Sequence, residues 1–471
     1  MDTSQTEQKP GIMGWIDRRF PFSSMMREHL TEYYAPKNFN FWYFFGSLLI
    51  LVLVIQIITG IFLTMHYQPN AKLAFWSVNQ GIMNDVSGGW FIRYMHVLGA
   101  SSFFVLVYFH MFRGMMYGSY KKPRELLWLV GMLLYVALCA EAFFGYLLPW
   151  GQMSFWGSNV VISLFGAIPV VGQSIAQWIR GDFVVGSPTL DRFFALHVIA
   201  VPLVLVILVF VHILALHQVG SNNPDGIEIK EHKNADGIPL DGIPFHPYYT
   251  VKDILGVAVF LAIYMGLIFF KPSGWGIVLD KLNYVPANAL KTPPDIHPLW
   301  FLTPYYAILR AWPSKILGVA SLAAVYILMF LIPWLDRSPV KSVRFRGVFV
   351  RINILVLSFS FILLGYLGLQ PATNTYVLLG YRFTEIFFST FWLMVYMNRV
   401  RSHMATVIWW IVMTGLFVAI DAWMVSVRAH SWGQLLESLW LPIGYVTIIL
   451  GGAWLKPSLV ADKAVPERVQ A

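Results

Sequence analysis

Residues 93–120 read RYMHVLGASSFFVLVYFHMFRGMMYGSY, a long apolar stretch with two histidines inside it. His96 and His110 are 14 residues apart, which corresponds to about 21 Å along an α-helix. Because each residue turns the helix by about 100°, this step returns the second imidazole to nearly the same face. The stretch therefore predicts a helix that presents two imidazoles on one side.

A second apolar stretch repeats this pattern. It carries His197 and His212, which are 15 residues apart. Two such helices placed face to face would form two stacked histidine pairs, one near each side of a bilayer. Histidine is a common axial ligand of haem iron. The spacing therefore predicts two haems in line, which would provide a path for electrons across a membrane.

Four glycines follow the same spacing. Gly46 and Gly60 are 14 residues apart in one apolar stretch, and Gly131 and Gly145 are 14 apart in another. Small residues let helices approach closely, so we expect these glycines to make room for a porphyrin. Glycine is common in membrane helices for other reasons, but the matched spacing favours the cofactor role.

The composition indicates an integral membrane protein. Of 471 residues, 57% are hydrophobic and 12% are charged, whereas soluble proteins carry about 25% charged residues. The net charge of +9 comes from basic residues clustered beside apolar runs, a pattern of membrane orientation and not of nucleic-acid binding. A single cysteine, Cys139, excludes internal disulfides, iron–sulfur ligation and covalent haem attachment.

Apolar runs long enough to cross a bilayer predict an all-α membrane fold with about ten spans. Lysine and arginine concentrate in the two termini and the even-numbered loops, which predicts that both termini are cytoplasmic. Eight spans would satisfy the same rule if the last two runs do not cross. The runs lie at about 41–65, 90–117, 126–148, 191–217, 251–271, 315–335, 348–369, 378–399, 404–427 and 437–455.

Four other segments join residues 93–120 as distinctive motifs. They are GYLLPWGQMSFWG (145–157), DRFFALH (191–197), GSNNPDG (220–226) and FHPYYTVKDILG (245–256). Together these motifs closely resemble the cytochrome b family, the haem subunit of the respiratory quinol:cytochrome c oxidoreductase (Complex III), in its bacterial type. The resemblance covers about residues 30–370.

The resemblance implies two non-covalent b-type haems. His96 and His197 match the ligands of the low-potential haem, near the periplasmic side. His110 and His212 match those of the high-potential haem, near the cytoplasmic side. Two axial imidazoles give a six-coordinate iron that carries electrons and does not bind oxygen.

Three arginines lie beside these histidines in the sequence. Arg93, Arg113 and Arg192 are candidates for pairing with haem propionates. The alternative is ordinary anchoring at the membrane interface, which weighs most for Arg192.

The family also implies a quinol-oxidation site at the periplasmic face. Its elements match residues 145–160 and the loop at 292–310. The candidate residues are Tyr146, Gly157, Pro298, Trp300, Phe301 and Tyr306.

A quinone-reduction site is implied at the cytoplasmic face, with ubiquinone and ubiquinol as the substrates. The candidates are His217, Ser221, Lys252 and Asp253. Reduction of a quinone needs two protons, which a histidine and a carboxylate can supply or relay. Alternatively, Asp253 is a carboxylate at the start of a helix.

One departure from the family concerns the periplasmic loop. The usual motif is Pro-Glu-Trp-Tyr, but here Leu299 replaces the glutamate thought to accept a quinol proton, and Phe301 replaces the tyrosine. Glu141 lies one helical turn before Gly145, and a carboxylate within a membrane helix is a functional hypothesis by default. We therefore hypothesise that Glu141 accepts the proton; the alternative is a structural carboxyl group.

Two further departures affect the helices. The step from His197 to His212 is one residue longer than in the mitochondrial form, and a kink or wide turn near Pro202 could absorb the extra residue. Residues 404–455 extend beyond the eight-span core. Asp421, within this extension, is interpreted as a structural hydrogen-bonding group and not as part of a proton channel.

The expected organisation has four parts. Residues 1–40 form a cytoplasmic segment, and residues 41–220 form the di-haem four-helix bundle, with periplasmic loop helices at 150–190. Residues 251–370 form a quinone-site domain. Residues 371–471 contain the last core span and the C-terminal extension.

Partners follow from what this chain lacks. Because it has one cysteine, a Rieske-type iron–sulfur centre and a cytochrome c-type haem must reside on separate subunits. The family implies a homodimer in the bacterial inner membrane, with quinone and lipid as small-molecule partners and no nucleic acid. The extension is a candidate contact with a partner subunit or another respiratory complex.

Two other functions stay open at this stage. A di-haem anchor of another enzyme, such as a formate dehydrogenase or nitrate reductase, would share the histidine pairs but lack the loops at 145–157 and 292–310. A transporter that relays protons through its histidines would have discontinuous helices and intramembrane charge pairs, and few such pairs are evident in the sequence.

Overall fold

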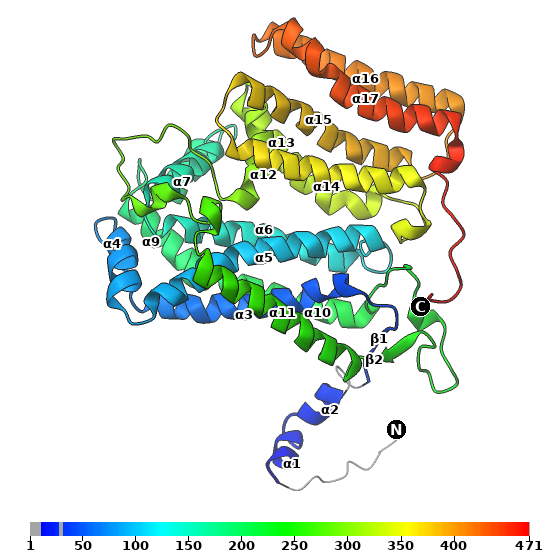
Figure 1. Cartoon of the computed structure of the whole chain (residues 1–471), viewed down its shortest axis with the longest axis horizontal. Helices are drawn as coiled ribbons and strands as arrows, with labels where there is room; N and C mark the ends of the chain where they lie inside the picture. The colour runs from blue at the N-terminus through cyan, green and yellow to red at the C-terminus, as the bar shows by residue number, and fades with distance from the viewer. Residues whose placement is uncertain (1–10, 28–31, 471) are drawn as a thin grey trace.

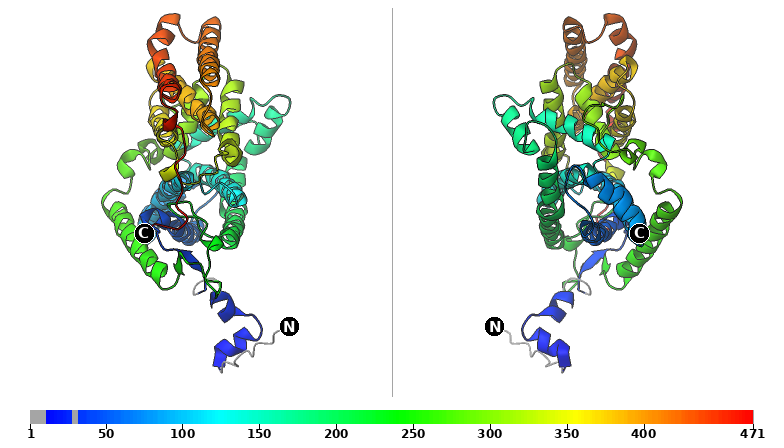
Figure 2. Two further views of the ribbon diagram at one scale, coloured as in Figure 1. Left: turned by 90° about the vertical axis from the view of Figure 1, so that its right-hand side faces the viewer. Right: turned by 90° about the vertical axis from the view of Figure 1, so that its left-hand side faces the viewer.

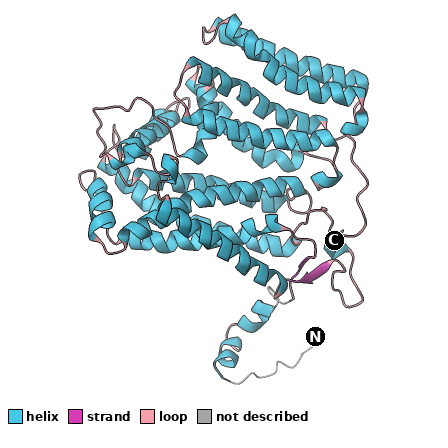
Figure 3. Ribbon diagram, in the orientation of Figure 1, coloured by secondary structure: helices cyan, strands magenta, loops and turns pink. Residues whose placement is uncertain are grey.

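Long apolar helices dominate the chain, and a single pair of short strands lies at one end (Figure 3). The computed structural model describes residues 11–27 and 32–470. Residues 1–10 and 28–31 of the predicted N-terminal segment, and residue 471, lie outside the described residues. The all-α membrane fold predicted from the sequence is confirmed.

Four helices and their neighbours form the bundle that carries the histidines. Helix α3 packs along α5, and α6 packs along α10 (Figure 1). Helix α11 lies against the outside of α3 and α5, at the margin of the bundle in the end-on views of Figure 2. The elements are α3 (Phe44–Thr64), α5 (Gly89–Tyr117), α6 (Glu125–Leu147), α9 (Ser187–Ala195), α10 (Val201–Val219) and α11 (Tyr248–Phe270).

The fourth predicted span, 191–217, contains a wide turn. Leu196–Ala200, between α9 and α10, is a π-helical segment that contains His197. A π turn holds one more residue than an α turn. It lies at the start of the 15-residue step from His197 to His212, where the sequence predicted such a turn.

The second half of the chain stacks two more layers on this bundle (Figure 1). Helix α14 packs against α12 and α15, and the α16–α17 hairpin forms the outermost layer, joined to the rest mainly through contacts of α17 with α15. The elements are α12 (Thr303–Arg310), α13 (Lys315–Leu335), α14 (Val348–Leu369), α15 (Asn374–Tyr396), α16 (His403–Ser426) and α17 (Trp432–Leu455).

The ten predicted spans correspond to helices whose ends differ by a few residues from the predicted ones. Within the described residues, nine helices are long and apolar enough to cross a membrane. Helix α15, the eighth core span, is not among these nine helices. It is less apolar because it carries Arg382, Glu385 and several hydroxyl groups.

A buried ionic cluster explains these charges. Arg382 of α15 places Nη2 2.7 Å from Asp421 Oδ2 in α16 and Nη1 2.7 Å from Glu385 Oε2. It also donates to Ser438 Oγ at 3.0 Å and the Leu435 carbonyl at 2.7 Å, both in α17. Asp421 is therefore a structural partner of Arg382, and the cluster ties the extension to the core.

Short elements cover one end of the bundles. Helices α7 (Gln152–Phe165) and α8 (Gly172–Arg180) lie where loop helices were predicted. Between α3 and α5, α4 (Ala74–Trp76) continues into a π-helical segment, Ser77–Asp85. Gln152 Nε2 also bonds the Lys291 carbonyl, which ties α7 to the loop before α12.

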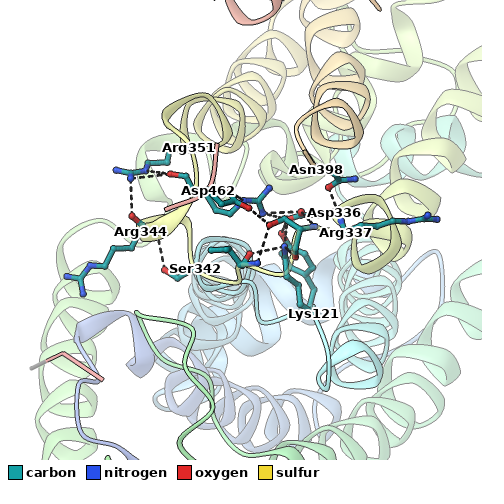
Figure 4. A network of polar contacts seen from close by, with 12 residues as sticks. Lys121, Asp336, Arg337, Ser342, Arg344, Arg351, Asn398 and Asp462 are labelled. Atoms are coloured by element: carbon teal, nitrogen blue, oxygen red, sulfur yellow. Dashed lines mark hydrogen bonds and ion pairs between the residues drawn. The ribbon is translucent and has the colours of Figure 1, made fainter. Parts of the chain in front are cut away.

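The opposite end is held by polar contacts between loops. Asp336, after α13, pairs with Lys121 at 3.0 Å and with Arg346 at 2.9 Å (Figure 4). Arg346 also bonds Asp462 at 2.9 Å, in the tail that follows α17. The loop between α5 and α6, the loop after α13 and the C-terminal tail are thereby joined.

The tail continues to the N-terminal side of the molecule. Strand β1 (Tyr34–Pro36) pairs with β2 (Gly242–Pro244) in antiparallel fashion. Beside this pair, Asp241 contacts Arg468 at 2.6 Å and Lys37 at 3.1 Å. The Arg468 hydrogen bond holds the pKa of Asp241 well below its usual value. The short helices α1 (Gly11–Asp17) and α2 (Phe22–Met26) project from this same end (Figure 1).

Candidate functional site

The four histidines meet in two pairs inside the first bundle. The ring centroids of His96 and His197 are 6.1 Å apart, and those of His110 and His212 are 6.4 Å apart. His96 and His110 both come from α5, while His212 comes from α10 and His197 from the π-helical segment. The structure thus brings together the pairs that the family resemblance implies.

The separation within each pair suits one metal held between two imidazoles. An ion midway between the two ring centroids would lie about 3 Å from each centroid. This distance is the sum of a typical metal–nitrogen bond, about 2.0–2.1 Å, and the radius of the imidazole ring. Among the described residues, no three His, Cys, Asp or Glu side chains gather to hold a bare metal ion. Two histidines are a ligand set that haem iron accepts.

Each histidine ring faces one of the predicted glycines. A Cβ atom built on Gly46, Gly60 or Gly131 would lie 3.3–3.4 Å from Cε1 of His110, His96 or His212, respectively. One built on Gly145 would lie only 2.3 Å from Cε1 of His197. These glycines therefore make room for the imidazoles themselves, which lets the rings occupy the space between the helices.

Hydrogen-bond acceptors surround the first pair. Thr59 Oγ1 lies 2.9 Å from His96 Nδ1. His197 Nδ1 lies 2.9 Å from Glu141 Oε1 and 3.0 Å from the Glu141 carbonyl oxygen. Arg93 joins His96, His197 and Glu141 in lining a cavity of about 270 Å³.

A guanidinium group approaches the second pair. Arg113 Nη2 lies 3.3 Å from His110 Nδ1, and His212 Nδ1 is buried without a hydrogen-bond partner within the described residues. Arg113 Nε is buried and has no hydrogen-bond partner within the described residues. Such a donor suits the carboxylate of a haem propionate.

A larger apolar cavity lies between α6, α7, α12 and α13. Its volume is about 750 Å³, within the range of small-molecule sites. Three of the six candidates for quinol oxidation, Gly157, Pro298 and Tyr306, line it together. Arg192 also lines this cavity, with its guanidinium 5.7 Å from the centre of the Trp178 ring.

The other three candidates face elsewhere. Tyr146 and Phe301 line the smaller cavity around the first histidine pair, as do Leu299 and Glu141. Tyr146 accepts a hydrogen bond from Asn283 Nδ2 at 2.9 Å.

Trp300 is also held away from the larger cavity, because its indole donates to Ser101 Oγ at 3.1 Å. The Pro298–Phe301 stretch therefore stands between the two cavities, with Pro298 facing the larger one and Phe301 the smaller one.

The quinone-reduction candidates lie at the other end of the bundle in two groups. Tyr33 stacks on His217 with ring centroids 4.7 Å apart, and its hydroxyl is 2.9 Å from Ser221 Oγ. In α11, Asp253 accepts a hydrogen bond of 2.8 Å from Ser47 in α3. Lys252 Nζ lies 5.2 Å from the centre of the Tyr249 ring.

Some residues of these sites were missed in the sequence. Thr59 precedes Gly60 directly and could have been suspected as a neighbour of His96. Tyr33 lies in no motif. His297 precedes Pro298, and its Nε2 is 3.4 Å from Asp280 Oδ2; this carboxylate raises the pKa of His297.

Comparisons with known proteins agree with this architecture. Residues 30–220 match the family model "Cytochrome b/b6/petB", and residues 286–388 match "Cytochrome b(C-terminal)/b6/petD". The matched residues end within α15, before the α16–α17 hairpin. The chain therefore belongs to the cytochrome b family.

Individual relatives bear this out. The chain is 55% identical to cytochrome b of Allochromatium vinosum over 82% of its own length and 95% of the relative. It is 47% identical to cytochrome b of Rhodospirillum rubrum, over 80% and 90% of the two chains. A solved structure titled "Hyperthermophilic respiratory Complex III" covers 82% of this chain and 98% of its own, with a TM-score of 0.76 and 38% identity. Family membership implies that the chain binds b-type haem in a multi-pass membrane protein.

Proposed function

We propose that this chain is the cytochrome b subunit of a bacterial quinol:cytochrome c oxidoreductase and carries electrons across the inner membrane. The observation that supports this most is the stacking of two histidine pairs within one bundle, with a 750 Å³ apolar cavity beside one pair. Both termini are placed in the cytoplasm, on the basis of the loop charges.

The first pair, His96 with His197, would hold the low-potential haem, and His110 with His212 the high-potential haem. When bound, these haems would supply one-electron transfer between two six-coordinate irons. The carboxylate that contacts His197 and the guanidinium that contacts His110 support this order, because negative charge favours the oxidised metal and positive charge the reduced one.

Quinol would bind in the cavity lined by Gly157, Pro298 and Tyr306. Its oxidation to quinone releases two electrons and two protons. One electron would go to a Rieske-type iron–sulfur subunit and the other to the haem ladder, at whose far end Tyr33, His217 and Ser221 would face a second quinone. A cytochrome c-type subunit and a second copy of the complex are the further expected partners.

The acceptor of the quinol proton is a separate part of the proposal. Leu299 stands where the family has glutamate, and Glu141 lines the same small cavity as Leu299. We keep Glu141 as the candidate acceptor. Replacement by glutamine would then slow quinol oxidation strongly, and near-normal turnover would contradict this role.

A reduced-minus-oxidised visible spectrum of the purified complex tests the haem assignment. Two b-type haems of different potential are expected, and absence of haem would overturn the proposal. Inhibitors directed at each membrane face should block two separable quinone reactions. A di-haem anchor with a single quinone site would show only one.

The quinol cavity is tested by filling it. The nearest atoms to a Cβ built on Gly157 are 3.7 and 3.9 Å away, so a side chain can begin there without a backbone clash. Gly157→Trp should abolish quinol oxidation while both haem spectra persist. The control is Gly415→Trp in α16, where nothing lies within 4 Å of the added Cβ; this variant should turn over normally.

A further inference from the structure

Glu141 touches one predicted haem ligand on the side away from the iron. Its Oε1 lies 2.9 Å from His197 Nδ1, and its own backbone carbonyl lies 3.0 Å from the same nitrogen. A histidine that binds metal through Nε2 has one proton on Nδ1, and the acceptor of that proton sets the orientation and basicity of the ring. Two acceptors on one residue therefore meet a single donor.

The carbonyl alone would be enough to hold the ring. The carboxylate adds a negative charge, which a carbonyl lacks, in a largely buried position. The side chains of Glu141 and His197 are only 16% and 17% exposed. Hydrogen bonds to ionised groups are shorter and about twice as strong as neutral ones.

Within the described residues, the other three predicted ligands have no carboxylate among their Nδ1 contacts. His96 is bonded by the neutral hydroxyl of Thr59 at the same distance of 2.9 Å. His212 Nδ1 has no hydrogen-bond partner within the described residues, and His110 Nδ1 lies 3.3 Å from a guanidinium nitrogen of Arg113. A carboxylate contact is thus specific to one of the four ring positions.

The second carboxylate oxygen also has a defined setting. Glu141 Oε2 is buried and has no hydrogen-bond partner within the described part of the chain. A carboxylate in a membrane helix is expensive, and the contact with His197 is the compensating interaction that the structure provides. Glu141 is therefore placed to act on His197, the predicted haem ligand, through this hydrogen bond.

We propose that Glu141 is a positioning residue that fixes the His197 ring and lowers the reduction potential of the haem held by His96 and His197. The proposal rests on the haem assignment made above. A carboxylate that accepts the Nδ1 proton makes the imidazole a stronger electron donor, and its charge stabilises the oxidised iron.

The main test is a potentiometric titration of the complete complex with Glu141→Gln. Glutamine keeps the shape of the side chain and a hydrogen-bonding oxygen but removes the charge. The reduction equilibrium of the low-potential haem should shift toward the reduced form by about tenfold, equivalent to 59 mV for one electron. The high-potential haem should not move.

Matched variants separate charge from packing. Thr59→Val removes the neutral bond on the opposite ligand and should shift the same haem much less. Glu141→Asp keeps the charge but shortens its reach, so the ferric electron paramagnetic resonance signal should change as the His197 ring reorients. If the glutamine variant loses the haem, an unchanged resonance signal in the aspartate variant would overturn the proposal.

The outcomes separate this inference from the proposals that precede it. Absence of haem in the unmodified complex would overturn the proposed function. Two haems present, with the potential of neither changed by Glu141→Gln, would overturn the positioning role alone. If quinol oxidation slowed while the potential stayed constant, Glu141 would be a proton acceptor and not a positioning residue.

Discussion

The two histidine pairs are built alike and surrounded differently. In both, one ring comes from α5, the other from the α9–α10 segment, and each ring faces a glycine. A carboxylate and a hydroxyl contact the rings of the first pair, whose cavity Arg93 also lines, whereas a guanidinium contacts a ring of the second pair directly. The helical repeat thus sets where the rings lie, and residues outside the repeat set the electrostatic character of each pair.

The largest expected effect comes from removing one ligand of each pair. His197→Asn should leave only the haem of higher potential, and His212→Asn only the haem of lower potential, because each iron loses an axial ligand. Haem absorbance should fall by about half in either variant, since one of the two six-coordinate sites is lost. A potentiometric titration that found the opposite survivors would reverse the assignment of the two pairs.

The next effect separates the glycines of the two pairs. A Cβ on Gly145 would lie 2.3 Å from the His197 ring, while one on Gly46 would lie 3.4 Å from the His110 ring. Gly145→Ala should therefore displace its histidine and deplete the low-potential haem, and Gly46→Ala should retain both haems.

The haem content and the thermal stability of Gly145→Ala and Gly46→Ala are the quantities to compare. Overpacking of this kind costs about 1–3 kcal/mol, so the melting temperature should fall further for Gly145→Ala than for Gly46→Ala. Equal behaviour of the two variants would show that the close contact relaxes without consequence.

A smaller effect is expected from the charge beside the second pair. Arg113→Gln should lower the potential of the high-potential haem, because a positive charge that favours the reduced iron is lost. The shift is expected to be below tenfold in the reduction equilibrium, or less than about 59 mV. Arg192→Gln is the control: Arg192 lines the larger cavity, so neither potential should change.

The smallest effect is expected at Thr59. Thr59→Val removes a neutral hydrogen bond, whose net contribution to stability is about 0.5–1.5 kcal/mol. The reduction potential changes only by the difference between the strength of this bond in the oxidised state and its strength in the reduced state. We expect a rise of threefold or less in the reduction equilibrium, about 0.65 kcal/mol. A shift as large as that of Glu141→Gln would mean that charge is not what distinguishes the first pair.

Much of the ladder could be predicted because it depends on helix periodicity. The spacing of four histidines and four glycines identified the bundle, and the apolar runs matched the helices within a few residues. The orientation of Glu141 was also available: positions 141 and 145 lie one turn apart and share a face, and Gly145 faces His197. Glu141 lines the cavity around the first histidine pair and not the larger cavity, although it is close to the quinol motif in sequence.

Other features could not be read from local sequence. Apart from Glu385, the partners of Arg382 come from α16 and α17, far along the chain, so no local pattern joins Arg382 to Asp421. Tyr33 reaches His217 only because the N-terminal segment folds back onto the end of the bundle. Gly157 and Tyr146 line different cavities and belong to different helices, whose relative placement the periodicity of each helix does not define.

The Arg382 cluster also bears on how the chain enters the membrane. A charged side chain near the middle of a lone spanning helix costs about 2.5–3.5 kcal/mol on insertion scales, and α15 carries two such side chains. The partner that neutralises Arg382 from outside α15 is synthesised later, in α16. The last three helices should therefore integrate as a unit, and a chain that stops after α15 should leave that helix poorly inserted.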